Sequence, residues 1–108
     1  GKPQIWYLDL FAGKNDHEAV QRAGESGHKE INRTNLSVDQ IAEGLKKDVV
    51  QKQLALIRMR NTHKAFSEGA EVTISGEESS LEIRWEYDGA YAELHVNFEE
   101  GTYTIESN

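Results

Sequence analysis

The sequence contains no cysteine, only one proline and no long apolar run. The lack of cysteine excludes disulfide bonds, thiol catalysis and zinc sites with thiolate ligands. No apolar stretch approaches the ~20 residues that a membrane-spanning helix needs. The N-terminus has no basic segment followed by an apolar one, so we expect no signal peptide. The lack of cysteine fits a cytoplasmic location, which we expect. Gly1, ahead of Lys2, could be the remnant of a tag.

Positive charge is also scarce, because 12 lysine and arginine residues stand against 19 aspartate and glutamate residues and the net charge is −7. An acidic surface repels the phosphates of nucleic acids and of anionic membranes, so we expect neither as a partner. Hydrophobic residues make up 37% of the 108 residues. This composition predicts one small domain with a modest core.

Residues 5–11 form the one nearly unbroken apolar run. Continuous runs of this kind are typical of parallel strands that are covered on both faces. No second run of this type exists in the chain, and the end of a larger α/β domain followed by a small β domain would give this order of elements. An orphaned strand edge tends to pair with another chain. We therefore expect either a homo-oligomer through strand 5–11 or disorder across residues 1–36.

Residues 12–36 are polar and interrupted by glycines, which predicts a long loop with a short helix from Asp16 to Ala23. Ordered loops of this length inside compact domains are usually functional. Helices are predicted after this loop, over residues 37–66, because Ser37 and Gln40 form a capping box.

Residues 70–106 have the pattern of an antiparallel meander. Apolar and charged residues alternate from 81 to 87, and Asp88-Gly89 then gives a strong hairpin signal. Return strands are predicted for residues 91–98 and 102–106. Together with the helices, this sheet predicts an α+β fold class for the isolated chain.

Three stretches carry recognisable motifs. They are residues 1–8 (G-K-P-Q-I-W-Y-L), residues 12–16 (A-G-K-N-D) with 27–33 (G-H-K-E-I-N-R), and residues 49–66, which end in L-I-R-M-R-N-T-H-K-A-F. They resemble the eighth barrel strand, the A-G-x-N-D … G-R-[DE]-I-N-R pattern and the last barrel helix of the sucrose phosphorylase family in the alpha-amylase superfamily. The later strands match this family only in position and pattern.

The resemblance implies a (β/α)8 barrel, or TIM barrel, of ~250 residues or more, with its active site on loops after the strands. Residues 1–66 would form the C-terminal end of that catalytic barrel, with strand 8, a substrate loop and the last helices. Residues 67–108 would form a small C-terminal antiparallel β domain.

The resemblance also implies a glycosyltransferase that cleaves sucrose with retention and passes the glucosyl group to phosphate. Retention requires two carboxyl groups ~5–5.5 Å apart. In the family these groups follow barrel strands 4 and 5, with a further aspartate after strand 7, and none of these positions lies in this chain. We therefore expect no catalytic residue and no cofactor here, and an inactive fragment of an active parent.

The residues that the resemblance assigns to substrate binding are Arg33 and Asn32. Arg33 would lie on the loop after strand 8, pair with an upstream aspartate and help to bind the glucosyl unit. The rigid fork of a guanidinium suits such a task. Without the surrounding motif, Arg33 would be interpreted as a solvated loop arginine.

The chain departs from the family pattern at positions 9, 29, 34 and 64. Lys29 replaces an arginine, and Thr34 stands where sucrose-specific members often have histidine. Both changes fall on the sugar-binding loop, so sucrose, sucrose 6'-phosphate and glucosylglycerate all stay open as substrates.

The histidines and the aromatic residues of the predicted strands do not indicate a further functional site. Four histidines are scattered without the close spacing of zinc ligands, so no metal site is expected. Trp85 and Tyr87 share a strand face with apolar residues, which favours core packing over a sugar platform. Two alternatives to an enzyme fragment remain, namely a non-catalytic carbohydrate-binding or interaction module and a purely structural α+β domain.

Overall fold

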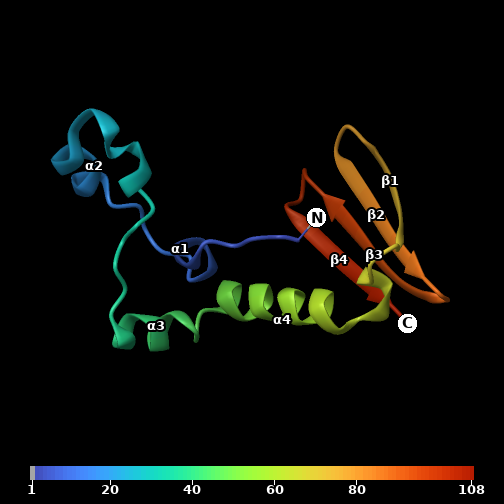
Figure 1. The fold of residues 1–108 in the computed structure, drawn as a ribbon. Coiled ribbons are helices and arrows are strands. Elements are labelled where there is room, and N and C mark those ends of the chain that lie inside the picture. Colours follow the sequence, from blue (N-terminus) through green and yellow to red (C-terminus); the bar gives the residue numbers. More distant parts are fainter. Residues whose placement is uncertain (1) are drawn as a thin grey trace. The chain divides into compact units, whose positions relative to one another are not determined.

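The computed structural model describes residues 2–108, so Gly1 and its interpretation as a tag remnant lie outside the described residues. The chain divides into two compact units, Gly1–Leu56 and Ile57–Asn108. Helices dominate the first unit and a four-stranded sheet dominates the second (Figure 1). The predicted α+β fold class of the isolated chain is confirmed, and the two units are described separately below.

The strand predicted over residues 5–11 is wrong. The chain has no regular structure up to Trp6 and then forms a short helix, α1 (Tyr7–Leu10). A parallel strand needs neighbouring strands to accept and donate its backbone hydrogen bonds. The strands within residues 2–108 pair only with one another, and the backbone of this segment pairs locally, with Leu10 N–H donating to Trp6 O at 3.0 Å.

This correction removes the exposed strand edge on which the expected homo-oligomer depended. Three short helical segments lie between residues 7 and 30, and disorder across residues 1–36 stays a prediction. The apolar run has a buried anchor, because Leu8 is only 1% exposed. Gly13 packs on it so closely that a Cβ there would lie 2.3 Å from Leu8 Cδ1.

The end of α1 is held by hydrogen bonds from distant side chains. Lys47 Nζ donates to the carbonyl of Phe11 at 3.2 Å, and Gln53 Nε2 donates to the carbonyl of Leu10 at 3.2 Å. The last carbonyls of a helix lack partners within the helix itself. These two side chains therefore satisfy them and, within the first unit, tie the end of α1 to residues 47–53 at the start of α4 (Asp48–Thr62).

The prediction of helices over residues 37–66 is confirmed, and three helical segments lie within this range. Helix α3 (Val38–Gly44) begins at a complete capping box, in which Ser37 and Gln40 each hold the backbone of the other. A break follows Gly44, and the 15-residue helix α4 starts at Asp48. Capping satisfies backbone N–H groups that have no partner inside the helix.

The second unit contains the predicted antiparallel meander in the order β1-β2-β3-β4 (Figure 1). Its strands are β1 (Glu71–Glu77), β2 (Ser80–Tyr87), β3 (Ala90–Asn97) and β4 (Thr102–Ser107). Asp88 and Gly89 link β2 to β3 with φ values of 47° and 77°. Positive φ at both central residues is the mark of a type I′ hairpin turn.

The core of this unit lies between the apolar sheet face and the short helix η2 (Lys64–Phe66). Ala65 and Ala92 are at most 1% exposed. The rings of Phe66 and Trp85 lie 5.2 Å apart. Trp85 thus packs against η2, as the core interpretation of this residue predicted.

Candidate substrate-binding loop

The loop of residues 12–36 contains two short helices of its own. Helix α2 (His17–Ala23) begins where the side chain of Asp16 accepts a hydrogen bond from Ala19 N–H at 2.9 Å. A 3-10 helix, η1 (Gly24–Glu30), follows directly. Gly27 is buried against α2, and a Cβ there would lie 2.4 Å from the carbonyl oxygen of Val20. Only glycine therefore allows η1 to pack so closely on α2.

Hydrogen bonds close the loop at its base. The N–H of Asp16 donates to the carbonyl of Ile31 at 2.8 Å. The hydroxyl of Thr34 donates to the carbonyl of Lys14 at 2.9 Å. The two ends of the loop are thus tied together, as in the compact surface loops known as Ω-loops.

Two aromatic side chains contact the same part of the loop from outside it. The indole N–H of Trp6 donates to the carbonyl of Asn32 at 2.8 Å. The hydroxyl of Tyr7 donates to the carbonyl of Thr34. The two rings also contact each other, with centroids 5.8 Å apart. The backbone carbonyls of the two residues that flank Arg33 therefore both accept hydrogen bonds from aromatic side chains.

Arg33 itself is exposed, with 51% of its side chain accessible. Its Nη1 lies 3.0 Å from Glu30 Oε1, at the end of η1. Among the described residues 2–108, Glu30 provides the one ion pair of Arg33. Exposed ion pairs of this kind contribute little stability. The guanidinium is therefore oriented by the loop but free to exchange its partner.

Asn32 and Thr34 flank Arg33 and differ in whether their side chains are hydrogen-bonded within the loop. Asn32 is half-buried, its carbonyl accepts from Trp6, and its side-chain amide makes no hydrogen bond within residues 2–108. The hydroxyl of Thr34 is already used inside the loop. Lys29, the other departure from the family pattern, lies exposed on η1.

The loop thus places Arg33 and the amide of Asn32 side by side in sequence on a closed, tethered backbone. A guanidinium and an amide can together donate to and accept from sugar hydroxyls. The motif identified these two residues. Trp6 and Tyr7 were missed, because they were assigned to a buried strand and nothing in the sequence linked them to carbonyl groups 26 and 27 residues away.

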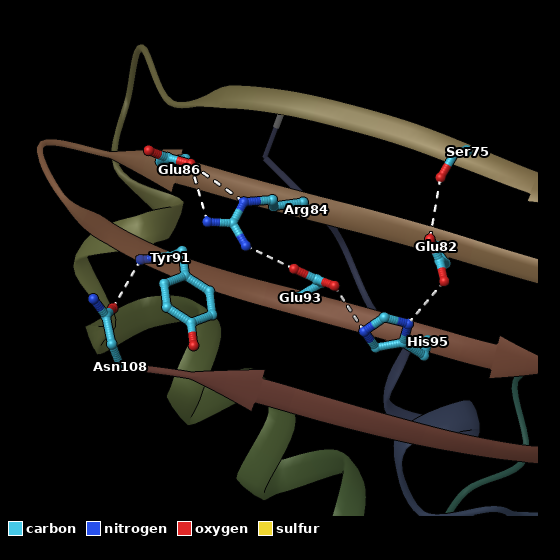
Figure 2. Close-up of polar contacts among 8 residues, drawn as sticks. All are labelled: Ser75, Glu82, Arg84, Glu86, Tyr91, Glu93, His95 and Asn108. Atoms are coloured by element: carbon cyan, nitrogen blue, oxygen red, sulfur yellow. Dashed lines mark hydrogen bonds and ion pairs between the residues drawn. The ribbon is translucent and has the colours of Figure 1, made fainter.

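A second polar cluster lies on the sheet of the other unit (Figure 2). Arg84 Nη1 contacts Glu93 at 2.7 Å, and His95 Nε2 contacts the other oxygen of Glu93 at 2.8 Å. The hydrogen bond from Arg84 lowers the pKa of the Glu93 carboxyl and raises the pKa of the guanidinium. Arg84 also lies 4.5 Å from the centre of the Tyr91 ring.

This cluster has the form of a cross-strand ion-pair network. Within residues 2–108, no group of three or more acidic or histidine side chains is arranged to hold a metal ion. No helix among these residues is both long and apolar enough to cross a membrane. The loop of residues 12–36, whose tethered backbone carries the two motif residues Asn32 and Arg33, is the candidate functional site of the chain.

The curated proteins that are similar to this chain are of one kind, namely phosphorylases. No family model matches the chain. Curated relatives along 90–98% of its length are the sucrose 6(F)-phosphate phosphorylases of Ilumatobacter coccineus (47% identical) and Thermoanaerobacterium thermosaccharolyticum (36%), and the glucosylglycerol phosphorylase of Marinobacter adhaerens (34%). All of these relatives are phosphorylases. The chain spans about a fifth of their length, 20–21%.

Structure comparison supports the same class. The crystal structure of sucrose 6F-phosphate phosphorylase from Thermoanaerobacter thermosaccharolyticum matches 97% of this chain with a TM-score of 0.86 and 37% identity, and the match covers 21% of that structure. Sucrose phosphorylases are also similar, among them that of Agrobacterium vitis at 35% identity over 97% of the chain and 21% of the relative. Along nearly its whole length the chain is similar to the sucrose phosphorylase family, as its motifs predicted, and it is consistent with a C-terminal portion of such a protein.

Proposed function

We propose that this chain is the C-terminal portion of a retaining phosphorylase that transfers the glucosyl group of sucrose to phosphate and so forms glucose 1-phosphate. The observation that carries the proposal is the tethered loop that presents Asn32 and Arg33, the two positions that match the substrate-binding motif of the family. Similarity to phosphorylases along nearly the whole chain supports it.

In this proposal Arg33 binds the glucosyl unit. Its fork can donate to a sugar hydroxyl and to a carboxylate at fixed geometry. Its present partner, Glu30, is itself 39% exposed. Replacing Glu30 by a substrate hydroxyl or by an upstream aspartate would therefore cost little free energy. The neighbouring Asn32 offers an amide with both donor and acceptor capacity.

The chemical step belongs to parts of the parent outside this chain. A retaining mechanism uses one carboxylate as nucleophile and one carboxylic acid as proton donor. By resemblance both follow earlier strands of a barrel. Residues 1–66 would complete that barrel and residues 67–108 would form the C-terminal β domain, so the 108-residue chain alone is proposed to be inactive.

Sucrose 6(F)-phosphate is the second candidate substrate, and one observation favours it. Relatives at 47% and 36% identity, and the structure at 37%, carry that activity in their names, whereas the sucrose phosphorylases match at 32–35%. Thr34, which stands where sucrose-specific members often have histidine, agrees with a different acceptor side. The glucosylglycerol phosphorylase widens the range of acceptors to be tested.

The test is a substrate panel on the full-length parent. Phosphate-dependent release of glucose 1-phosphate is measured from sucrose, sucrose 6(F)-phosphate, glucosylglycerol and glucosylglycerate, with the present chain as the control. Release from one of the two sucroses by the parent, and none by the fragment, is the expected result. Absence of release from all four donors would overturn the proposed reaction.

A cytoplasmic location and the absence of nucleic-acid and membrane partners remain predictions from the sequence.

A further inference from the structure

We propose that Trp6 and Tyr7 are positioning residues that hold the backbone on both sides of Arg33 and so aim its guanidinium at the sugar. This inference rests on the proposed function of the loop. Trp6 donates to the carbonyl of residue 32 and Tyr7 donates to the carbonyl of residue 34. Arg33 is the residue between these two anchors.

The two anchors differ from the other ties of the loop. The bonds from Asp16 and Thr34 join parts of the loop to each other, so they fix its shape but not its direction. Trp6 and Tyr7 lie outside the loop, at the start of α1. Helix α1 is itself held by Lys47 and Gln53. The anchors therefore connect the backbone around Arg33 to a fixed helix.

Rigid aromatic donors suit this task. A tryptophan or tyrosine places its polar tip with only two side-chain torsions, so little freedom is lost when the bond forms. Both side chains are partly exposed, at 42% and 37%, so their role is not that of a buried core. Small errors in the placement of a substrate-binding group reduce catalysis strongly, since a displacement of ~1 Å can cost ~100-fold.

The experiment uses conservative variants of the full-length parent, numbered as here. Trp6→Phe removes the indole N–H and Tyr7→Phe removes the hydroxyl, while each keeps an aromatic ring. Tyr103→Phe is the matched control, because Tyr103 is an exposed tyrosine (47%) on β4 whose hydroxyl makes no hydrogen bond within residues 2–108. All variants are made with Arg33 present and again with Arg33→Ala.

A positioning role predicts coupling between the anchors and Arg33. The double variant Trp6→Phe/Tyr7→Phe should lower kcat/KM about tenfold when Arg33 is present and less than about twofold when Arg33 is already alanine. The control should leave kcat/KM unchanged in both backgrounds. Equal losses in the two backgrounds, or no loss with Arg33 present, would overturn the proposal, because a merely structural role acts regardless of Arg33.

Amide hydrogen exchange gives a second readout that needs no activity. The N–H of Arg33 is held by the carbonyl of Glu30 at 3.1 Å, so loss of the anchors should speed its exchange about fivefold or more. Unchanged exchange in the double variant would also contradict the proposal. If the wild-type parent phosphorolyses no donor, the proposed function fails, and hydrogen exchange still decides whether the anchors hold the loop.

Discussion

Glu30 and Arg33 lie three residues apart and form an ion pair of 3.0 Å at the end of η1. The pair holds the guanidinium close to its own loop, yet both side chains remain largely accessible, at 39% and 51%. An exposed pair is stabilised only weakly, because water competes for both partners. Glu30 therefore orients the guanidinium of Arg33 through a weak ion pair, and a ligand can replace Glu30 as its partner.

Glu30→Gln should accordingly change stability very little. We expect the free energy of unfolding of the chain to fall by no more than about 0.5 kcal/mol, measured by urea denaturation. Glu43→Gln, which breaks the similar exposed pair with Lys46, is the matched control and should behave alike. A loss above about 1.5 kcal/mol for Glu30→Gln alone would mean that the pair is a structural element of the loop.

Gly27→Ala should disrupt the packing of η1 on α2. An added Cβ would meet the carbonyl oxygen of Val20 at 2.4 Å, and backbone atoms cannot move aside as a flexible side chain can. The expected destabilisation is about 1–3 kcal/mol, with faster proteolytic cleavage within residues 12–36. The control is Gly24→Ala, where no atom lies within 4 Å but φ is +69°. If Gly27→Ala unfolds and is cleaved like wild type, the close contact is absent in solution.

The Arg84–Glu93 pair should make the sheet sensitive to acid. Arg84 lowers the pKa of Glu93 from its ordinary value of 4.5, so the folded state binds this proton less readily than the unfolded state. The resulting stabilisation is present above pH 4.5 and is lost as the pH falls through the lowered pKa of the folded state. Thermal unfolding should therefore show wild type more stable than Glu93→Gln at neutral pH, with the difference shrinking below pH 4.5. A difference that stays constant with pH would contradict this assignment.

Gly89→Ala should weaken the hairpin between β2 and β3. Gly89 has φ of 77°, a conformation that costs a residue with a Cβ about 1–2 kcal/mol. Asp88→Asn is the comparison, because asparagine also accepts positive φ and only the exposed pair with Lys64 is lost. Denaturation should rank Gly89→Ala well below Asp88→Asn in stability, and the reverse order would argue against a type I′ turn.

Local signals in the sequence predicted the local structure well. The Ser37–Gln40 capping box and the Asp88-Gly89 turn depend on residues within three positions of one another, so the chain itself specifies them. The alternation around Trp85 likewise predicted the face that packs on Phe66. Patterns of this kind are set by short-range geometry and need no knowledge of the rest of the fold.

The apolar run of residues 5–11 could not be interpreted in the same way. A continuous run fits a buried strand or a buried helix equally, and the outcome depends on which partners are present. In the described chain Leu8 is buried within a short helix instead. The anchors Trp6–Asn32 and Tyr7–Thr34 join residues 26 and 27 positions apart, far beyond the reach of capping, turn and periodicity signals. The motif predicted which loop residues matter, but not what holds them.

The most direct test of the account is the effect of Arg33→Ala on phosphorolysis by the full-length parent. Arg22→Ala is the matched control, since Arg22 is an exposed arginine of the same loop whose pairs with Asp16 and Glu18 are both at 3.5 Å. Loss of a charged hydrogen bond to the sugar should lower kcat/KM by roughly 10- to 100-fold for Arg33→Ala and leave Arg22→Ala near wild type. Near-normal kcat/KM for Arg33→Ala, with glucose 1-phosphate still released by the wild type, would contradict the claim that this loop binds the substrate.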